Sequence, residues 1–344
     1  EILFDKLKLP VIKRTKTGPS TDEEVLTALA ASHKLPAMLL DYRQMVKLKF
    51  TYIDVLPELI DHKTERVHTS FNQAVTETGR LSSSNPNLQN IPIKTELGSS
   101  IRKAIIAFSS DSYLLSCDYS QMELRILAHF SKDETLLAAF KHNKDIHRIT
   151  ASLIFGVKEE AVDNSMREVA KRINFGIVYG LSAYGLSHDL KIKQEEAQGF
   201  IDAYFLRYPG VKDYIEKQIK RAEEDGFVTT MLGRRRYLPE INGKNQAMRS
   251  FAQRQAVNTP LQGSSSDLIK LAMVHIDREI LKNNLKAKMI LQIHDELLFD
   301  VPAKGKHEFI AMVKDKMENV LKLDVPVRVD VKIGRNWLQM EEVK

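Results

Sequence analysis

Hydrophobic and polar residues in one stretch of the chain follow the pattern of a strand that leads into a helix. Residues 113–125 read YLLSCDYSQMELR, and side chains alternate between two faces up to Asp118, which is the period of a strand. From Gln121 onward, apolar residues recur at steps of four, which is the period of a helix. The pattern predicts a strand that ends on Asp118, although such a carboxylate could equally be a surface residue.

A second strand-length pattern surrounds another acidic group. Residues 289–301 read MILQIHDELLFDV, so two apolar runs flank the polar triplet His294-Asp295-Glu296. A buried helix is possible, but a hairpin with two carboxylates at its tip is the simpler interpretation. Two acidic strand ends on neighbouring strands could hold a pair of divalent cations roughly 4 Å apart. Oxygen ligands of this kind suit Mg²⁺ or Mn²⁺.

Residues 166–180, MREVAKRINFGIVYG, have the pattern of a helix with an unusual polar face. Arg167, Lys171, Phe175 and Tyr179 follow one another at steps of four and form one slowly winding stripe. Two cations followed by two aromatics could bind a triphosphate at one end and a base or sugar at the other. An amphipathic helix with buried aromatics and solvated cations remains the alternative.

The rest of the chain is divided by its composition. Residues 1–65 are typical of helices, with a capping box at 21–24, and residues 132–230 are also mostly helical in pattern. Residues 66–71 predict a strand, and residues 78–92, rich in Gly, Ser, Asn and Pro, predict irregular backbone. The alternation of valines over 325–331 predicts a closing strand.

One further segment has a polar face and a small-residue patch. Arg254, Asn258 and Gln262 recur at steps of four and would share one face of a helix, which Pro260 would kink. The small residues that follow, at 263–266, suit a close approach of two backbones.

Composition and charge narrow the class of protein. The chain has 344 residues, 43% of them hydrophobic and 28% charged, which is typical of a globular protein with a large core. Its net charge of +6 permits a nucleic-acid partner without requiring one. The single cysteine excludes an internal disulfide and suits a reducing cytosol. No apolar run is long enough to span a membrane, and there is no signal peptide, so we expect a cytoplasmic protein without a membrane partner.

Four stretches together resemble the family A DNA polymerases, over essentially the whole chain. Residues 118–125 (DYSQMELR) resemble the family's first catalytic motif. Residues 292–296 (QIHDE) resemble its third, which usually has Val where Ile293 stands. Residues 78–92 match its primer-side loop. The residues that match its nucleotide-binding helix are Arg167, Lys171, Phe175, Tyr179 and Gly180.

The resemblance implies an α+β, right-hand architecture with an antiparallel palm sheet, helical fingers and a truncated helical thumb. We expect residues 1–65 to be part of the thumb, 66–131 and 249–344 the two parts of the palm, and 132–248 the fingers. The family's proofreading-type and 5′-nuclease domains lie ahead of the thumb, so we expect no proofreading in this chain. A monomer in the bacterial cytoplasm, associated with the nucleoid, is the expected form.

The implied reaction is template-directed DNA synthesis, in which a primer 3′-hydroxyl attacks the α-phosphate of a dNTP and pyrophosphate leaves. Two Mg²⁺ ions, for which Mn²⁺ could substitute, would be held by Asp118, Asp295 and the backbone carbonyl of Tyr119. Glu296 would be a nearby catalytic carboxylate of lesser weight. Lys171 would protonate the departing pyrophosphate.

The resemblance also implies the residues that contact the substrates. Glu123 would exclude a ribose 2′-hydroxyl and hydrogen-bond to Tyr179. The nucleotide-binding residues would be Arg167, Lys171, Phe175, Tyr179, His147, Glu123 and Gln121. The residues that contact primer and template would be Arg80, Asn87, Asn90, Arg254, Asn258, Gln262 and His294.

Three other functions compete with DNA synthesis. A two-metal nuclease also needs paired carboxylates, but it has no use for a helix that grips a triphosphate. A DNA-binding module without catalysis would have lost Asp118, Asp295 or Lys171, and all three are present. A polymerase that makes RNA shares the metal chemistry, but Glu123 argues against it because a small residue there would admit the ribose.

Overall fold

The computed structural model describes residues 1–344 except residues 94 and 344. It separates into two compact units. Unit 1 comprises Glu1–Ser70 and Ser83–Arg102, and unit 2 comprises Phe71–Ser82 and Lys103–Lys344. The described chain contains no helix that is both long and apolar enough to cross a membrane.

Unit 1 is mostly helical, as the pattern over residues 1–65 predicts. The helix start expected near residues 21–24 is confirmed, but the capping box is wrong in detail: the N-cap of the first helix is Asp22 rather than Thr21, and its side chain accepts a hydrogen bond from Val25 N at 3.0 Å. The helices are α1 (Glu23–Ala30), α2 (Lys34–Leu48), α3 (Val55–Glu58) and α4 (Glu96–Ser100), with π-helical turns at Ile2–Lys6 and Lys49–Ile53 and a 3₁₀ turn at Ile101–Ala104. Two short hairpins are formed by β1 (Arg14–Thr15) with β2 (Gly18–Pro19), and by β3 (Ile60–Asp61) with β4 (Arg66–Val67).

The chain passes between the units three times, near residues 70, 82 and 102. The single strand expected over 66–71 is wrong in detail: β4 ends at Val67, and β5 (Ser70–Asn72) begins only after two further residues. The irregular run over 78–92 contains one short strand, β6 (Ser82–Ser84).

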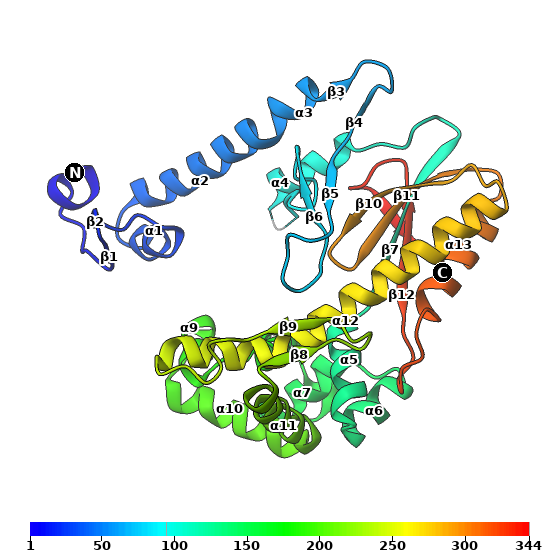
Figure 1. Ribbon diagram of the computed structural model, residues 1–344. Helices are drawn as coiled ribbons and strands as arrows, with labels where there is room; N and C mark the ends of the chain where they lie inside the picture. The colour runs from blue at the N-terminus through cyan, green and yellow to red at the C-terminus, as the bar shows by residue number, and fades with distance from the viewer. Residues whose placement is uncertain (94, 344) are drawn as a thin grey trace. The chain divides into compact units, whose positions relative to one another are not determined.

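Unit 2 is built on a five-stranded sheet with the order β10-β11-β7-β12-β13 (Figure 1). Every neighbouring pair in it is antiparallel. Its strands are β7 (Ser112–Tyr119), β10 (Lys288–Ile293), β11 (Glu296–Pro302), β12 (Val329–Gly334) and β13 (Met340–Glu342). The predicted hairpin over 289–301 is therefore confirmed as β10 and β11, and the predicted strand that ends near Asp118 is β7.

The two faces of this sheet differ in polarity because side chains alternate along each strand. One face carries buried apolar residues of β7, β11 and β12, such as Leu115, Phe299 and Val331. Helix α13 (Lys306–Glu318) packs against these three strands and buries that face. The opposite face carries Ser116, Asp118 and their polar neighbours, and it forms the candidate site.

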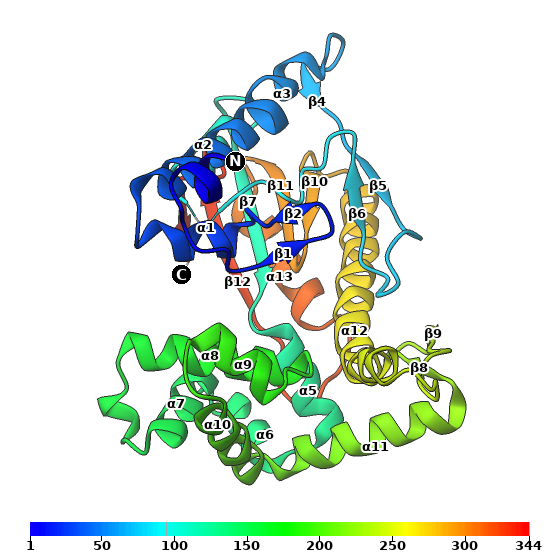
Figure 2. The same cartoon turned by 90° about the vertical axis from the view of Figure 1, so that its left-hand side faces the viewer.

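The helices between β7 and β10 gather at the end of the sheet where β7 passes into α5, except that the last and longest of them continues from there to α13 (Figures 1 and 2). They are α5 (Met122–Ser131), α6 (Glu134–Lys141), α7 (Ile146–Phe155), α8 (Asn164–Val178), α9 (Ala183–Leu190), α10 (Gln194–Arg207), α11 (Pro209–Asp225) and α12 (Gln246–Lys282). A 3₁₀ turn (Glu159–Ala161) precedes α8, and the hairpin of β8 (Phe227–Thr229) and β9 (Arg235–Tyr237) precedes α12.

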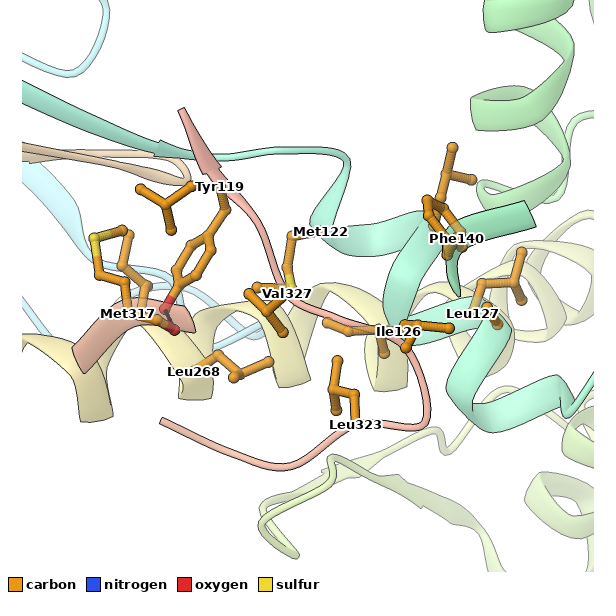
Figure 3. Packing of buried hydrophobic residues seen from close by; sticks show 14 of the residues in the cluster. Tyr119, Met122, Ile126, Leu127, Phe140, Leu268, Met317, Leu323 and Val327 are labelled. Carbon is orange, nitrogen blue, oxygen red and sulfur yellow. Dashed lines mark hydrogen bonds between the residues drawn. The ribbon is translucent and has the colours of Figure 1, made fainter. Parts of the chain in front are cut away.

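The junction between β7 and α5 is packed against the core from several directions. Tyr119 donates a hydrogen bond from its hydroxyl to the carbonyl of Met317 at 2.9 Å. Figure 3 shows this ring pointing toward Met317, with Met122 and Ile126 of α5 next to Val327 and Leu268. The strand end that carries Asp118 is thus held rigidly by its buried neighbours.

One expectation about the second half of unit 2 changes. The closing strand begins at Val329, because the ladder with β7 starts there, and Val325 and Val327 are buried without belonging to a strand. The helix expected around residues 254–262 is part of α12, which is continuous over 37 residues and contains Pro260.

Candidate active site

Three carboxylates lie side by side at one end of the sheet. Asp118 of β7 is the register partner of Glu296 on β11 and of Asp330 on β12. Directly opposed residues on antiparallel strands project from the same face, with Cβ atoms roughly 5 Å apart. Asp295 lies next to them, because Tyr119 N donates to the Asp295 carbonyl at 3.1 Å. The two acidic strand ends that the sequence predicts are therefore brought together.

This crowding changes the acidity of Asp118. Desolvation by the surrounding protein raises its pKa, and repulsion from Glu296, Asp295 and Asp330 adds to the shift and places it at about 7. Lys332 opposes the shift but does not cancel it. Part of the Asp118 side chain remains open to solvent, so a bound cation could reach it and relieve the repulsion.

Two of the carboxylates are held in place by hydrogen bonds. Asp295 Oδ1 accepts from the Ser265 hydroxyl of α12 at 3.0 Å. Glu296 Oε1 accepts from the Ser116 hydroxyl at 2.6 Å and from the Trp337 indole at 3.0 Å. Glu296 is thereby tied to the strand beside it and to the C-terminal segment, whereas no side-chain hydrogen bond is recorded for Asp118 within the described residues.

The donor set fits Mg²⁺ better than a metal that needs a complete protein cage. Nowhere in the described residues do three or more His, Cys, Asp or Glu side chains converge in an arrangement that could hold a metal ion. Mg²⁺ is usually bound through one or two carboxylates, with water and substrate phosphates completing the shell. Asp118 and Asp295, with the neighbouring Tyr119 carbonyl, satisfy that requirement.

A thermal unfolding experiment tests the repulsion directly. Because the folded protein raises the Asp118 pKa from 3.8 to about 7, it binds more protons than the unfolded chain in that window, and stability falls as pH rises through it. At pH 8 without divalent metal, Asp118→Asn should therefore raise Tm, by the equivalent of at most about 1 kcal/mol because the group is partly exposed. Added Mg²⁺ should raise the Tm of the parent more than that of the variant. Equal Tm values without metal, or equal responses to Mg²⁺, would contradict this assignment.

A second polar cluster surrounds Glu123, in the first turn of α5. Glu123 is buried, and its two oxygens accept hydrogen bonds from Tyr179 Oη and from an Arg80 guanidinium nitrogen, each at 2.8 Å. Burial raises the pKa of Glu123, and burial beside this carboxylate raises the pKa of Tyr179 to about 12. The contact between Glu123 and Tyr179 that the resemblance implies is thus present in the structure.

Arg80 reaches Glu123 because the turn that precedes it is tethered to α12. Ser266 donates to the Gly79 carbonyl at 2.6 Å, and the Arg234 guanidinium lies directly over Gly79, where an added Cβ would be 2.3 Å from it. Arg234 is itself paired with the buried Asp267 at 2.8 Å. Gly79 also has φ +77°, so this position favours glycine both for its backbone and for its space.

The stripe on α8 is present as the sequence predicts, but its members differ in environment. Arg167 Nε donates to Asp145 Oδ2 at 2.7 Å. Lys171 is exposed, and no hydrogen bond or ion pair is recorded for it within the described residues. Phe175 is half-buried, with its ring centroid 5.8 Å from that of His147. Tyr179 is the residue immediately after the helix, in its C-cap position.

Arg254, Asn258 and Gln262 all lie within α12 and share one helical face, as the sequence predicts. Two atoms of this region have unmet hydrogen-bonding capacity. Asn258 Oδ1 and Arg80 Nε are buried, and neither has a partner among the described residues. Arg254 lies against Gly180, whose φ is +69° and where an added Cβ would be 2.7 Å from Arg254 Cγ. Buried polar atoms without protein partners call for a ligand or water.

The remaining predicted residues lie at turns. Gln121 and His294 both have positive φ, +52° in each case, at the start of α5 and at the tip of the β10–β11 hairpin. In unit 1, the backbone carbonyl of Asn90 accepts a hydrogen bond from Tyr52 Oη at 2.6 Å, and Asn87 Oδ1 accepts one from Gln89 N at 3.0 Å.

Sequence reasoning missed several residues that hold this site together. Ser116, Trp337 and Ser265 position the carboxylates, and Asp267 and Arg234 position the Arg80 turn. The basic run 234–236 is engaged within the protein: Arg234 pairs with Asp267, Arg235 lies over the Phe227 ring and Arg236 bonds to Thr259 and Glu77. Only the small residues at 263–266 gave a usable signal, because they predicted the close approach that Ser266 and Gly79 make.

Comparison with known proteins finds relatives over almost the whole chain. The chain is 50% identical over 338 residues to DNA polymerase I from Caldicellulosiruptor bescii, a match that covers 98% of this chain and 40% of the relative. It is 49% identical over 343 residues to the thermostable DNA polymerase I of Thermus aquaticus, covering 99% of this chain and 41% of that protein. The chain thus spans about two fifths of the length of these curated relatives.

A solved structure has the same fold. The POL domain of Pol1 from M. smegmatis, in complex with DNA primer-template and dNTP, superposes with a TM-score of 0.93 at 44% sequence identity, over 98% of this chain and 59% of that one. The family described as DNA polymerase family A matches residues 1–339. A match of this extent, together with the relatives and the shared fold, leads to one conclusion: the chain belongs to DNA polymerase family A.

Proposed function

We propose that this chain carries out template-directed DNA synthesis, adding dNTPs to a primer 3′-hydroxyl with release of pyrophosphate. The main support for the proposal is that Asp118 and Asp295 lie together at one end of the sheet in a chain of this family. The M. smegmatis POL domain, which was solved in complex with a DNA primer-template and a dNTP, supports the same substrates here. The enzyme would act as a monomer on chromosomal DNA in the bacterial cytoplasm.

The right-hand architecture is part of the proposal. The five-stranded sheet of unit 2 would be the palm, formed by residues 66–131 and 249–344. The helices over residues 132–248 would be the fingers, and residues 1–65 part of the thumb. Nucleotide would then be delivered from α8 to the sheet end that carries Asp118.

Asp118, Asp295 and the Tyr119 carbonyl would hold two Mg²⁺ ions, for which Mn²⁺ could substitute. When bound, these ions lower the pKa of the attacking hydroxyl and neutralise charge on the triphosphate. The hydrogen bonds from Ser265 to Asp295, and from Ser116 and Trp337 to Glu296, keep the neighbouring carboxylates oriented. Holding ligands in place before substrate arrives reduces the reorganisation needed in the reaction.

The stripe on α8 would bind the nucleotide. Arg167, Lys171 and His147 would contact the triphosphate, and the exposed Lys171 is the candidate to protonate the departing pyrophosphate. Phe175 would pack on the nucleotide, and Tyr179 would lie near the templating position. Gln121, at the turn into α5, would complete the nucleotide site.

Primer and template would be contacted from several elements. Arg80 and Gln262 suit the minor groove, where hydrogen-bond acceptors occupy similar places in every correct base pair. The unmet capacity of Arg80 Nε and Asn258 Oδ1, judged among the described residues, supports such contacts. The full set of proposed DNA-binding residues is Arg80, Asn87, Asn90, Arg254, Asn258, Gln262 and His294.

Primer extension with dNTPs or rNTPs and Mg²⁺ separates this function from its competitors. A DNA polymerase extends the primer with dNTPs only, and an RNA-synthesising relative accepts rNTPs equally well. A two-metal nuclease shortens the DNA, and a binding module leaves it unchanged. Either of the last two results, from folded protein, would overturn the proposal.

The choice of sugar should depend on Glu123. Its buried carboxylate and its partner Tyr179 would close the pocket where a ribose 2′-hydroxyl would lie. Glu123→Ala should therefore raise rNTP incorporation, and we expect the dNTP-to-rNTP ratio of kcat/KM to fall about tenfold or more, which corresponds to about 1.4 kcal/mol of lost discrimination. The Glu168→Ala variant, which changes an exposed carboxylate on α8, is the control and should leave the ratio unchanged. An unchanged ratio in Glu123→Ala would place the discriminating group elsewhere.

A further inference from the structure

A hydrogen-bonded series of buried polar side chains leads to His147, the residue proposed above to contact the triphosphate. His147 is 2% exposed, and Asn174, Thr150 and Tyr208 behind it are each 0% exposed. Asn174 Nδ2 lies 3.0 Å from His147 Nδ1, and Thr150 Oγ1 lies 3.1 Å from Asn174 Oδ1 and 3.2 Å from Tyr208 Oη. These residues come from α7, α8 and the segment just before α11, so the hydrogen-bonded series joins these three elements.

Counting the available hydrogens identifies the donor and the acceptor in each hydrogen bond of this series. Asn174 Oδ1 can only accept, so the single hydroxyl hydrogen of Thr150 is used there. Tyr208 must then be the donor to Thr150. At the other end, Asn174 Nδ2 can only donate, so His147 Nδ1 accepts and carries no hydrogen. The ring proton of a neutral His147 is therefore on Nε2.

We propose that Asn174 is a positioning residue that fixes His147 as a neutral Nε2–H donor toward a phosphate oxygen of the bound nucleotide. The inference rests on the proposed function, since it supplies the anion that His147 would contact. Thr150 and Tyr208 act through Asn174 by fixing the orientation of its amide. The His147 ring already has the required tautomer before the nucleotide binds, which lowers the free-energy cost of binding.

The charges around His147 favour the neutral ring. The pKa of His147 is lowered to about 4, chiefly by burial; Asp145 and Glu168 oppose the shift, and Arg167 and Lys171 add to it. No partner of His147 Nε2 is recorded within the described residues, which leaves this atom for a ligand. The contact should therefore not depend on pH in the neutral range.

Nitrogen NMR of the imidazole tests the tautomer without any measurement of activity. Long-range ¹H–¹⁵N spectra, with His147 assigned by its loss in His147→Gln, should show Nε2 protonated and Nδ1 unprotonated from pH 5.5 to 8. Protonation of Nδ1 in the parent would mean that the Asn174 amide has the opposite orientation, and would overturn the proposal. Primer extension is measured on the same sample, so a failure of the proposed function is recognised separately.

Asn174→Asp reverses the contact while keeping the size of the side chain. A carboxylate at this position can only accept, so it should hold the proton on Nδ1 and raise the pKa of the ring. At pH 8 the Nε2–H donor is then lost, and KM for dNTP should rise roughly 10-fold, which is the value of a hydrogen bond to a charged group. Near pH 6 the doubly protonated ring regains that donor, so most of the loss should be recovered.

Asn164→Asp is the matched control, since it makes the same change at the exposed first residue of the same helix. It should leave KM and its pH dependence as in the parent. If Asn174→Asp does not fold, Thr150→Val removes the hydroxyl that orients the amide, whereas Thr150→Ser retains it. Nδ1–H should then appear in the Val variant and not in the Ser variant. Variants that leave the His147 spectrum and the pH profile of KM unchanged would show that Asn174 is only structural.

Discussion

Asp118→Ala and Asp295→Ala should each abolish primer extension while leaving affinity for primer-template within a few-fold. These carboxylates would hold the ions that stabilise charge in the transition state, and loss of ~5 kcal/mol of that stabilisation slows the step roughly 10³- to 10⁴-fold. DNA affinity is expected to survive because it depends on phosphate and groove contacts spread over many residues. The measurement is the single-turnover rate of adding one nucleotide, with DNA affinity determined separately.

Asp330→Ala is the matched control for this experiment. Asp330 is the register partner of Asp118 on the other side, so it shares the same face and end of the sheet but is not a proposed ligand. Its loss should leave the rate within about tenfold of the parent. A near-normal rate in Asp118→Ala or Asp295→Ala would contradict the two-metal assignment. An equal loss of rate in all three variants would show that the carboxylate cluster acts only through its total charge.

Phe175→Tyr should largely abolish discrimination against dideoxynucleotides. A ddNTP lacks the 3′-hydroxyl, and Phe175, one helical turn beyond Lys171, offers no polar group to replace it. Tyr would place a hydroxyl about where the missing one lay, on a ring of the same shape. A hydrogen bond to a charged group is worth ~1.5–3 kcal/mol, which is roughly 10- to 150-fold in rate.

The ratio of kcat/KM for dTTP over ddTTP measures this effect. The ratio should be large in the parent and should fall toward one in Phe175→Tyr, with dTTP rates little changed. Phe50→Tyr, the same change on an exposed ring of unit 1, should leave the ratio as it is. A ratio already near one in the parent, or one that does not fall, would mean that Phe175 does not face the sugar.

The local elements of the site could be predicted because their signals lie within short stretches of sequence. Alternation up to Asp118 predicts β7, and two apolar runs around His294-Asp295-Glu296 predict the hairpin of β10 and β11. The stripe on α8 follows from helical spacing alone. Each of these patterns lies within a window of roughly 11–18 residues.

Long-range pairing could not be predicted in the same way. Nothing in the sequence places Asp330 beside Asp118 or sends the Trp337 indole to Glu296, because strand order and register depend on the whole fold. The alternating valines illustrate the limit: Val325 and Val327 have the pattern of a strand and are buried, but the partner strand is available only from Val329 onward.

His147 shows how a single residue gains meaning from its surroundings. In the sequence it is a solitary histidine, a residue type that is usually structural. The structure places it next to Asn174 and Phe175, which are 27 and 28 positions further along the chain on another helix. Contacts at that separation leave no periodic signal, so they had to come from the fold.

Single-nucleotide addition on a defined template shows whether this chain copies the template base with the help of divalent metal. Four primer-templates, differing only in the first template base, are each mixed with one dNTP at a time in Mg²⁺, and primer length and pyrophosphate are followed together. We expect extension by one nucleotide only for the complementary dNTP, with one pyrophosphate released for each nucleotide added and no reaction when the metal is chelated. Extension that ignores the template base, or that persists without divalent metal, would contradict this expectation.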